Sequence, residues 1–285
     1  MHSSAAPRLD ASSGKDVAYE NFPVGSWLLP ARLRPHVAIF YAFARSADDI
    51  ADSPDLTSAE KIERLNCHER ALLGGELDDP GCATAHAMRL SLAATGTSSR
   101  HCVDLLAAFK QDATKLRYRD WHELTGYCRL SAAPVGRYLL DLHGGASDGY
   151  ASSDALCIAL QILNHLQDAK ADYLDLDRVY LPTSWFAAER ASIAELRGTA
   201  TTPGMRRVFD RTLDGVDRLI ETAGGLGPAL VSARLAMEAE SIVAIARSLS
   251  AKLRHNDPLG RRVVLNKAQY VGCIVAGIAR ALVRR

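Results

Sequence analysis

Two stretches of the chain place carboxylates at helical spacing on segments that are otherwise apolar, and this combination limits the folds that the chain can adopt. In the first stretch, the uncharged run 37–44 leads directly into a group of aspartates. A helix turns by about 100° per residue, so residues three or four apart share one face. The stripe formed in this way consists of Tyr41, Arg45, Asp48 and Asp52, with Asp49 on its flank.

The second stretch follows the apolar run 155–160 and repeats the pattern with other residues. A helix that is apolar over most of its surface is usually buried, so both polar stripes are expected to face a cavity or its mouth and not bulk water. In this second stripe, amide and carboxylate side chains recur at three- and four-residue intervals. They are Gln161, Asn164, Asp168, Asp172 and Asp175.

Carboxylates that cluster on buried helices repel one another unless cations neutralise them. Mg²⁺ binds a few carboxylates, keeps several waters and completes its shell with substrate phosphates. A single Asp-x-x-x-Asp pattern is normally a solvated helix face, whereas two such patterns on apolar helices favour a paired Mg²⁺ site. Arg45 and Arg178 are either counter-ions of these carboxylates or, with Lys170 or Lys267, ligands of a diphosphate.

The composition favours a helical fold. Hydrophobic residues make up 48% of the 285 residues but aromatic residues only 6%, and strand-like alternation is nearly absent, so we expect an all-α protein. Short clusters of Gly, Pro, Ser and Asp separate the apolar segments. We expect a flexible N-terminal lead-in at residues 1–18 and one domain at residues 19–285. The expected helices cover residues 35–53, 58–73, 83–94, 100–118, 121–143, 152–174, 203–221, 227–253 and 262–283.

Charge and motif content exclude several classes of function. With 34 basic and 33 acidic residues the chain has no overall basic field, which argues against a nucleic-acid partner. No secretion signal is recognisable, and the apolar stretch 270–279 is far shorter than the ~20 residues that span a bilayer, so we expect a cytoplasmic protein. Zinc-hydrolase, serine-hydrolase and nucleotide-binding patterns do not occur in the sequence.

The order and spacing of the aspartate motifs resemble the squalene/phytoene synthase family. The similarity extends from residue 20 to the C-terminus and includes the segments 127–136 and 257–263. It implies an isoprenoid-synthase helical fold, whose central cavity is flanked by two Asp-rich helices that hold Mg²⁺ and a diphosphate. The matching motifs are Tyr41 and Arg45 before the segment 48–52, and Asn164, Asp168 and Asp172 before the segment 177–182.

The resemblance also implies roles for individual residues. The expected metal ligands are Asp48, Asp49, Asp52, Asn164, Asp168 and Asp172. The expected contacts to substrate or diphosphate are Arg45, Tyr127, Gln161, Asn164 and Arg178. A catalytic role is expected for Tyr41, Arg45, Asp48, Asp52, Asp168 and Asp172.

Three departures from the commonest family pattern point to one branch. Gln167 stands where many members have arginine, residues 170–172 read Lys-Ala-Asp in place of Gly-Glu-Asp, and residues 131–133 read Ser-Ala-Ala in place of Val-Ala-Gly. These features are similar to the bacterial hopanoid-pathway branch, whose members convert presqualene diphosphate to hydroxysqualene. The implied reaction depends on Mg²⁺, releases diphosphate and needs no hydride donor.

Two alternatives remain open. One is head-to-head condensation of farnesyl or geranylgeranyl diphosphate to presqualene diphosphate, squalene or phytoene. The other is a non-catalytic helical assembly protein, which the presence of all four motif carboxylates disfavours. The expected partners are a prenyl diphosphate, other enzymes of the squalene pathway and, because such substrates and products are very apolar, the inner face of the membrane as a peripheral contact.

Overall fold

Helices account for the regular structure in the part of the chain that the computed structural model describes, residues 29–75, 80–145 and 147–284. The predicted lead-in at residues 1–18 lies outside this part. Within the described residues there is no β-strand, only an isolated bridge between Arg117 and Val179. The α-helices are α1 (Arg34–Asp52), α2 (Ser58–Leu73), α3 (Ala83–Thr95), α4 (Arg100–Asp112), α5 (Trp121–Ser131), α6 (Ala133–Leu142), α7 (Tyr150–Leu176), α8 (Thr183–Ala188), α9 (Pro203–Ala223), α10 (Leu226–Ala229), α11 (Ala233–His255) and α12 (Lys267–Val283).

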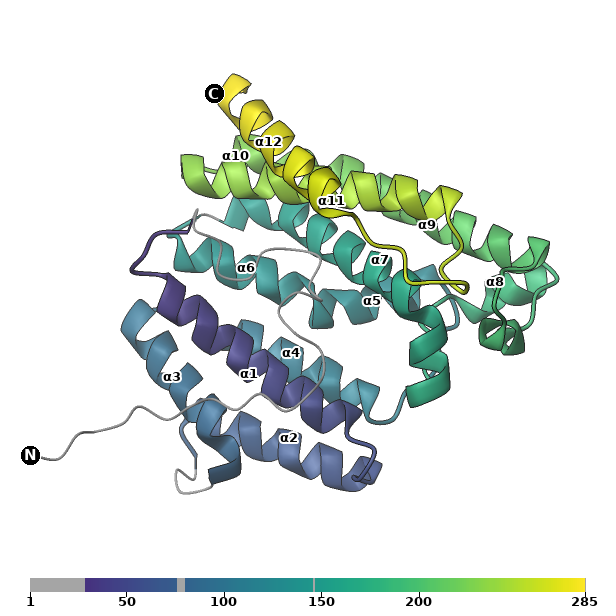
Figure 1. The fold of residues 1–285 in the computed structure, drawn as a ribbon. Helices are drawn as coiled ribbons and strands as arrows, with labels where there is room; N and C mark the ends of the chain where they lie inside the picture. Colours follow the sequence, from purple (N-terminus) through teal and green to yellow (C-terminus); the bar gives the residue numbers. More distant parts are fainter. Residues whose placement is uncertain (1–28, 76–79, 146, 285) are drawn as a thin grey trace, which may run out of the picture.

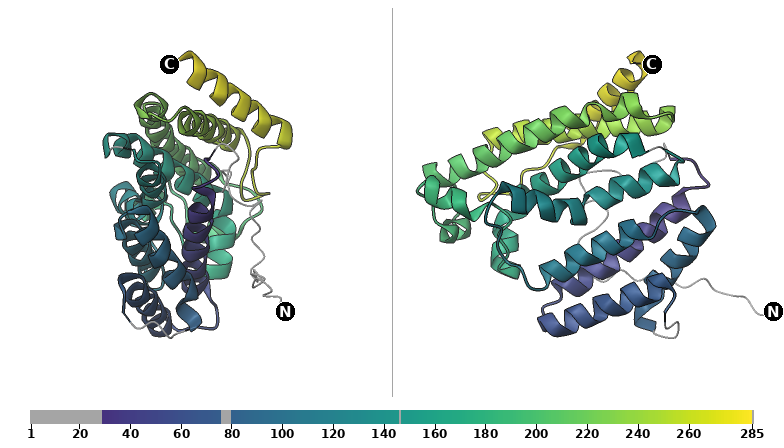
Figure 2. Two further views of the ribbon diagram at one scale, coloured as in Figure 1. Left: turned by 90° about the vertical axis from the view of Figure 1, so that its left-hand side faces the viewer. Right: turned by 180° about the vertical axis from the view of Figure 1, so that it is seen from behind.

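The longest of these helices, α7, lies at the centre of the molecule (Figure 1). It packs against α5, α6, α9 and α11, whereas α1 packs against α2, α3 and α4, and α4 joins the two groups through α5 and α6. Figure 2 shows α12 on the outside of α11. Side chains such as Phe43, Leu163 and Phe209 are buried between these helices, and each stabilises the fold by about 1.5–3 kcal/mol through removal of apolar surface from water.

Local capping explains why the predicted limits of α2 agree with the structure. The Thr57 side chain accepts a hydrogen bond from the Glu60 backbone N–H, and the Glu60 carboxylate accepts one from the Thr57 backbone N–H. This reciprocal pair satisfies two donors that the first helical turn leaves unpaired. At the other end, Gly74 adopts a left-handed φ of 98°, which ends the helix after Leu73.

Two predicted helices are each divided in the structure. The predicted helix 121–143 is broken at Ala132, because Pro134 has no N–H to donate and its ring would clash with the preceding turn of a continuous helix. The proline instead occupies the first turn of α6, where no donor is needed. The predicted helix 227–253 is divided into α10 and α11, and the Ser232 side chain caps the start of α11.

Two other predicted helices are too long, and α8 was not predicted. The predicted helix 100–118 ends at Asp112, because the carbonyls of Leu116 and Tyr118 accept hydrogen bonds from the backbone N–H groups of Val179 and Thr183. This pairing between distant segments replaces the local helical bonds. The predicted helix 262–283 begins only at Lys267, after the capping side chain of Asn266.

Helices α6 and α7 approach each other closely at Gly136. A Cβ atom at this position would lie 2.3 Å from Ser153 Oγ and 2.7 Å from Cys157 Sγ, both on α7. Any residue larger than glycine would therefore force the Ser153 and Cys157 side chains to move. Gly136, Ser153 and Cys157 all line the cavity described below, so this contact fixes part of its wall.

Candidate active site

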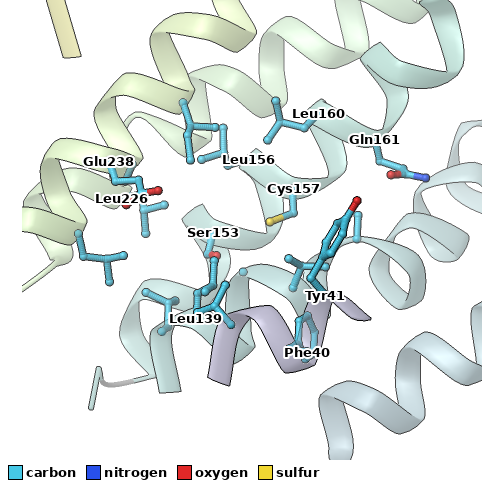
Figure 3. Close-up of a pocket in the computed structure, with 18 of the residues that line it drawn as sticks. Phe40, Tyr41, Leu139, Ser153, Leu156, Cys157, Leu160, Gln161, Leu226 and Glu238 are labelled. Atoms are coloured by element: carbon cyan, nitrogen blue, oxygen red, sulfur yellow. The ribbon is translucent and has the colours of Figure 1, made fainter. Parts of the chain in front are cut away.

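A cavity of about 270 Å³ lies between α1, α6, α7, α10 and α11. Its walls are mainly aliphatic, and Leu156 and Leu160 of α7 are examples (Figure 3). Figure 3 also shows that polar side chains lie at its two ends, with Tyr41 and Gln161 at one end and Glu238 at the other. An aliphatic cavity binds a hydrocarbon chain by removing its surface from water.

Three predicted site residues line the cavity and are polar. Tyr41 comes from α1, and Gln161 and Asn164 come from α7, so both Asp-rich helices flank the cavity, as predicted. Each helix continues from these residues into its aspartate motif. Asp48 lies about two turns after Tyr41, and Asp168 lies about one turn after Asn164.

The aspartates of α1 lie at its C-terminal end, where the helix dipole disfavours negative charge. Arg45 compensates for this charge from the same helix. One of its guanidinium nitrogens lies 3.1 Å from Asp48 Oδ2, and another lies 2.9 Å from Asp49 Oδ1. Both aspartates are partly exposed. Because solvent screens such pairs, another cation can replace Arg45 at little expense of free energy.

Arg178 connects the ends of α1 and α7. Its side chain donates hydrogen bonds to Asp52 Oδ1 (2.5 Å) and to the Ala51 carbonyl (3.0 Å). Its backbone N–H donates to the Asp172 carbonyl (3.0 Å). Asp177, in a left-handed conformation with φ of 50°, ends α7 and turns the chain so that Arg178 can make both contacts. A single residue thereby touches both aspartate motifs.

A buried polar layer supports Arg178. The Tyr127 hydroxyl donates to Asp112 Oδ2 (2.6 Å), and the Tyr180 hydroxyl donates to Asp112 Oδ1 (3.3 Å). Burial raises the pKa of Asp112 to about 6, although Arg178 and the Tyr127 hydroxyl oppose the shift. Burial also opposes the charge of Arg178, but Tyr180 and the surrounding carboxylates outweigh it and raise the pKa of the guanidinium. His165 stacks on Tyr180, and burial lowers its pKa to about 3, so this imidazole is neutral.

Tyr127 was predicted to contact the substrate. It is buried, its hydroxyl is bound to Asp112, and it is not among the described residues that line the cavity. Its ring lies against Tyr180, at 5.5 Å between centroids. Substrate contact by Tyr127 stays a prediction, and the observed contacts place this side chain in the layer that supports Arg178.

Asp168 is bound by an arginine that the sequence patterns did not assign to the site. Arg262 Nε lies 2.6 Å from Asp168 Oδ1, and Arg262 Nη2 lies 3.1 Å from Asp168 Oδ2 and 3.3 Å from Asn164 Oδ1. This two-point contact is the strongest geometry between a guanidinium and a carboxylate. Arg262 precedes α12 and is 94 residues from Asp168, so helical spacing gives no sign of the pairing. Asp172 Oδ2 lies 3.9 Å from His165 Nδ1.

The two lysines considered as diphosphate ligands have other surroundings. Lys170 Nζ donates a hydrogen bond to the Gly198 carbonyl (2.9 Å). Lys267 is the exposed first residue of α12. In the described part of the chain, the cations bound to the motif aspartates are Arg45, Arg178 and Arg262.

The donor chemistry of the two motifs suits a hard divalent cation. All of the predicted metal ligands offer oxygen atoms, which Mg²⁺ prefers. Within the described residues no three histidine, cysteine or carboxylate side chains converge on a preformed metal site. Mg²⁺ needs only one or two protein carboxylates when waters and phosphates complete its shell, so each motif by itself offers enough donors.

The chain is similar in sequence to several known proteins. A family model described as squalene/phytoene synthase matches residues 16–269. A hydroxysqualene synthase of Rhodopseudomonas palustris is 40% identical over 273 residues, which cover 96% of this chain and 92% of the relative. A hydroxysqualene synthase of Sinorhizobium fredii is 38% identical over 286 residues, which cover 100% of this chain and 95% of the relative.

Solved structures with the same helical arrangement confirm the predicted isoprenoid-synthase fold. A squalene synthase from Alicyclobacillus acidocaldarius has a TM-score of 0.72 and 30% identity, with coverage of 81% of this chain and 87% of that chain. A dehydrosqualene synthase in complex with a ligand has a TM-score of 0.74 and 19% identity, with 92% of both chains covered. The second likeness concerns the fold alone.

Proposed function

The chain belongs to the squalene/phytoene synthase family and is an enzyme of that family, and we propose that it converts presqualene diphosphate and water to hydroxysqualene and diphosphate with Mg²⁺. One observation carries the proposal. The polar end of an aliphatic cavity adjoins two aspartate motifs that three arginines balance. The names of the two curated relatives support the same reaction step.

The aliphatic cavity binds the two prenyl arms of the substrate. Most of its walls, such as Leu156 and Leu160, are aliphatic and offer no lone pair, although Ser153 and Cys157 also line it. An aliphatic wall suits a reaction that passes through a carbocation, because a lone pair close to the cation would react with it. The arms therefore lie in the cavity while the diphosphate stays at the polar end.

The diphosphate is bound by Arg45, Arg178 and Arg262, which exchange part of their contact with aspartates for phosphate oxygens. Guanidinium groups suit this role because their planar donors pair with two phosphate oxygens at once. The residues that would hold Mg²⁺ are Asp48, Asp49 and Asp52 on α1, and Asn164, Asp168 and Asp172 on α7. Bound Mg²⁺ supplies further positive charge that stabilises the departing diphosphate.

The reaction begins when the carbon–oxygen bond to diphosphate breaks and its electron pair leaves with the diphosphate. The cyclopropylcarbinyl cation that remains rearranges within the aliphatic cavity. Gln161 and Asn164 carry amide donors and acceptors at the polar end, where they can hold one water molecule. The water oxygen attacks the cation and loses a proton to the released diphosphate or to solvent. Atoms and charge balance without a hydride donor.

Product analysis tests this proposal. Purified protein, presqualene diphosphate and Mg²⁺, without NADPH, are expected to yield hydroxysqualene and one diphosphate for each alcohol formed. Formation of presqualene diphosphate or phytoene from farnesyl or geranylgeranyl diphosphate would favour the head-to-head alternative. No turnover with any of these substrates, by folded protein, would contradict the enzymatic proposal.

A pair of variants on α7 tests whether the activity depends on the aspartate motif of this helix. Asp168→Asn removes one predicted metal ligand and is expected to abolish most of the activity. Asp175 was predicted to share the polar stripe with Asp168, but it is exposed at the end of α7, so Asp175→Asn is expected to leave the activity nearly unchanged. Equal loss in the two variants would contradict the assignment of Asp168.

A further inference from the structure

Helix α12 presents an uncharged, apolar surface to the outside of the molecule. Val271, Val275 and Leu282 are 57%, 61% and 57% exposed, and Val283 is 86% exposed. No side chain on this surface carries a charge or a hydrogen-bonding group. The α12 outer face, as we call it, consists of Ala268, Val271, Gly272, Val275, Ala276, Ala279, Leu282 and Val283.

The opposite side of α12 is fixed firmly to α11. A Cβ atom at Gly277 would lie 2.3 Å from the Ser241 Cα atom, so the two helix backbones are in close contact. Arg284 Nη1 lies 2.9 Å from Glu240 Oε1, and Arg280 Nη1 lies 3.7 Å from Glu240 Oε2. Glu240 is buried, so both arginines are drawn toward α11 and away from the outer face. The outer face is therefore held in place and is not a loosely attached end.

A helix that is apolar on both sides is normally buried on both sides. Among the described helices, α11 is the one that packs extensively against α12, and it covers only the inner side (Figure 2). Exposed apolar surface of this kind indicates contact with another molecule. The question is which molecule covers the outer face.

The distribution of charge indicates which molecule covers the α12 outer face. Ten basic and three acidic residues lie between residues 233 and 285, although the whole chain has 34 basic and 33 acidic residues. Two of the three acidic residues, Glu238 and Glu240, are buried. No acidic residue lies between residues 258 and 285, where six basic residues lie. Three of these are paired with Asp168 or Glu240, but Arg261 and Lys267 are exposed beside the uncharged outer face. A second copy of the chain would add like charges at this edge, whereas anionic lipid headgroups would be attracted to them.

We infer that the α12 outer face binds an anionic lipid bilayer. The helix lies in the plane of the interface, with Val271, Val275 and Leu282 inserted at the boundary of headgroups and acyl chains. Arg261 and Lys267, both exposed, contact the headgroups at one end of the helix. Among the described residues no helix is long and apolar enough to cross a bilayer.

This contact would place the cavity close to the lipid. Leu235 and Ile242 of α11 line the cavity, and α12 packs on the same helix. Packed helices lie about 8–10 Å apart, so the two helices α11 and α12 separate the cavity from the bound bilayer. The inference itself concerns binding and does not depend on the proposed reaction.

Vesicle co-sedimentation tests the inference without any measurement of activity. The full chain is mixed with vesicles of phosphatidylcholine and phosphatidylglycerol, or of phosphatidylcholine alone. Sedimentation is expected with the anionic vesicles and is expected to be weaker with the neutral ones. High salt should weaken binding to the anionic vesicles, because it screens the attraction between basic residues and headgroups.

Exposed positions on two different helices provide matched variants. The double variant Val271→Asp, Val275→Asp is expected to weaken binding by about tenfold or more, because each aspartate replaces an inserted apolar group and repels the anionic surface. Leu90→Asp on α3 changes a side chain that is 63% exposed and is expected to leave binding unchanged. Circular dichroism should show the same helical content in both variants, because all three positions are exposed.

Three results would overturn the inference. The first is no sedimentation of the wild-type chain with either kind of vesicle. The second is equal binding by the wild type and the double aspartate variant. The third is a dimer, measured by light scattering, that the double variant dissociates, because this result would assign the outer face to a second copy of the chain.

Discussion

Asp48 and Asp49 in the motif of α1 are balanced by an arginine of their own helix, whereas Asp168 in the motif of α7 is balanced by an arginine from a distant segment. On α1, Asp48 and Asp49 are 34% and 46% exposed, and Arg45 reaches them from one turn away. On α7, Asp168 is 16% exposed and is bound by Arg262, 94 residues further along the chain. The two motifs carry similar groups but differ in burial and in the origin of their counter-ion.

This difference determines how each motif can accept a ligand. Arg45 is at a partly exposed site and can change its rotamer while its helix stays in place. Arg262 holds Asp168 through two hydrogen bonds in a less exposed site, so binding of another cation there requires the segment before α12 to adjust. The α7 motif is therefore expected to be the more sensitive of the two to substitution, and Arg178 to be more critical than either because it contacts both.

The largest effect is expected from Arg178→Met, which removes the link between the two motifs. The change leaves Asp52 and the buried Asp112 without their shared counter-ion. Loss of one partner from a buried ion pair destabilises a protein by about 3–5 kcal/mol, so the free energy of unfolding in urea should fall by this amount. Arg178→Lys keeps the charge but cannot reach both Asp52 and the Ala51 carbonyl, and should recover only part of the loss. Unchanged unfolding of Arg178→Met would contradict the bridging role.

The next largest effect is expected on kcat, when one carboxylate from each motif is replaced. Asp168→Asn is expected to reduce kcat with presqualene diphosphate by about 10²–10³-fold, because it removes charge stabilisation of the leaving group. Asp49→Asn, at the flank of the exposed motif, is expected to reduce kcat by less than about tenfold. Similar losses of kcat in the two variants would show that neither the burial of the carboxylate nor the sequence distance of its counter-ion determines its contribution to catalysis.

A pH series tests the layer beneath Arg178. Burial raises the pKa of Asp112 from its ordinary 3.8 to about 6. A carboxyl with a raised pKa in the folded state contributes stability that is fully present below about pH 4 and is lost as the pH rises through about 6. Relative to Asp112→Asn, the wild type should lose roughly 3 kcal/mol of unfolding free energy across this interval. A constant difference between the two proteins from about pH 4 to pH 7 would argue against the raised pKa.

The smallest effects are expected from conservative changes of the counter-ions. Arg262→Lys loses the two-point contact with Asp168 and is expected to raise KM for the diphosphate substrate by about tenfold. Arg45→Lys preserves a charge near two exposed carboxylates and is expected to raise KM by about two- to threefold. A larger effect at Arg45 than at Arg262 would reverse the comparison between the two motifs.

The contrast between the motifs also explains which parts of the site could be predicted from the sequence. Helical spacing was sufficient to place Arg45 beside Asp48 and Asp49, because these contacts lie within one helix. The Arg262 contact depends on the path of the chain between α7 and α12, which no local pattern records. The burial of Asp112 could have been predicted from the sequence, because this residue lies in phase with the apolar Leu105 and Phe109 on α4.

The fold shows the same dependence on local and distant interactions. The predicted limits of α2 agree with the structure because a capping box at Thr57 begins the helix and Gly74 ends it, and both act within a few residues. The break before Pro134 was recorded in the sequence by the proline itself but was missed. The end of α4 could not be read locally, because Leu116 and Tyr118 form backbone hydrogen bonds with a segment that follows α7.

The close contact at Gly136 has a consequence for how enzymes with this cavity can diversify. A larger side chain on α6 at this point would meet Ser153 Oγ and Cys157 Sγ, so a substitution that narrows the cavity from this side requires both side chains to move. Leu226 and Leu235, which line it from α10 and α11, are side chains that aliphatic exchange can shorten or lengthen. Descendant sequences that select shorter or longer prenyl chains are therefore expected to vary on α10 and α11 while glycine persists at position 136.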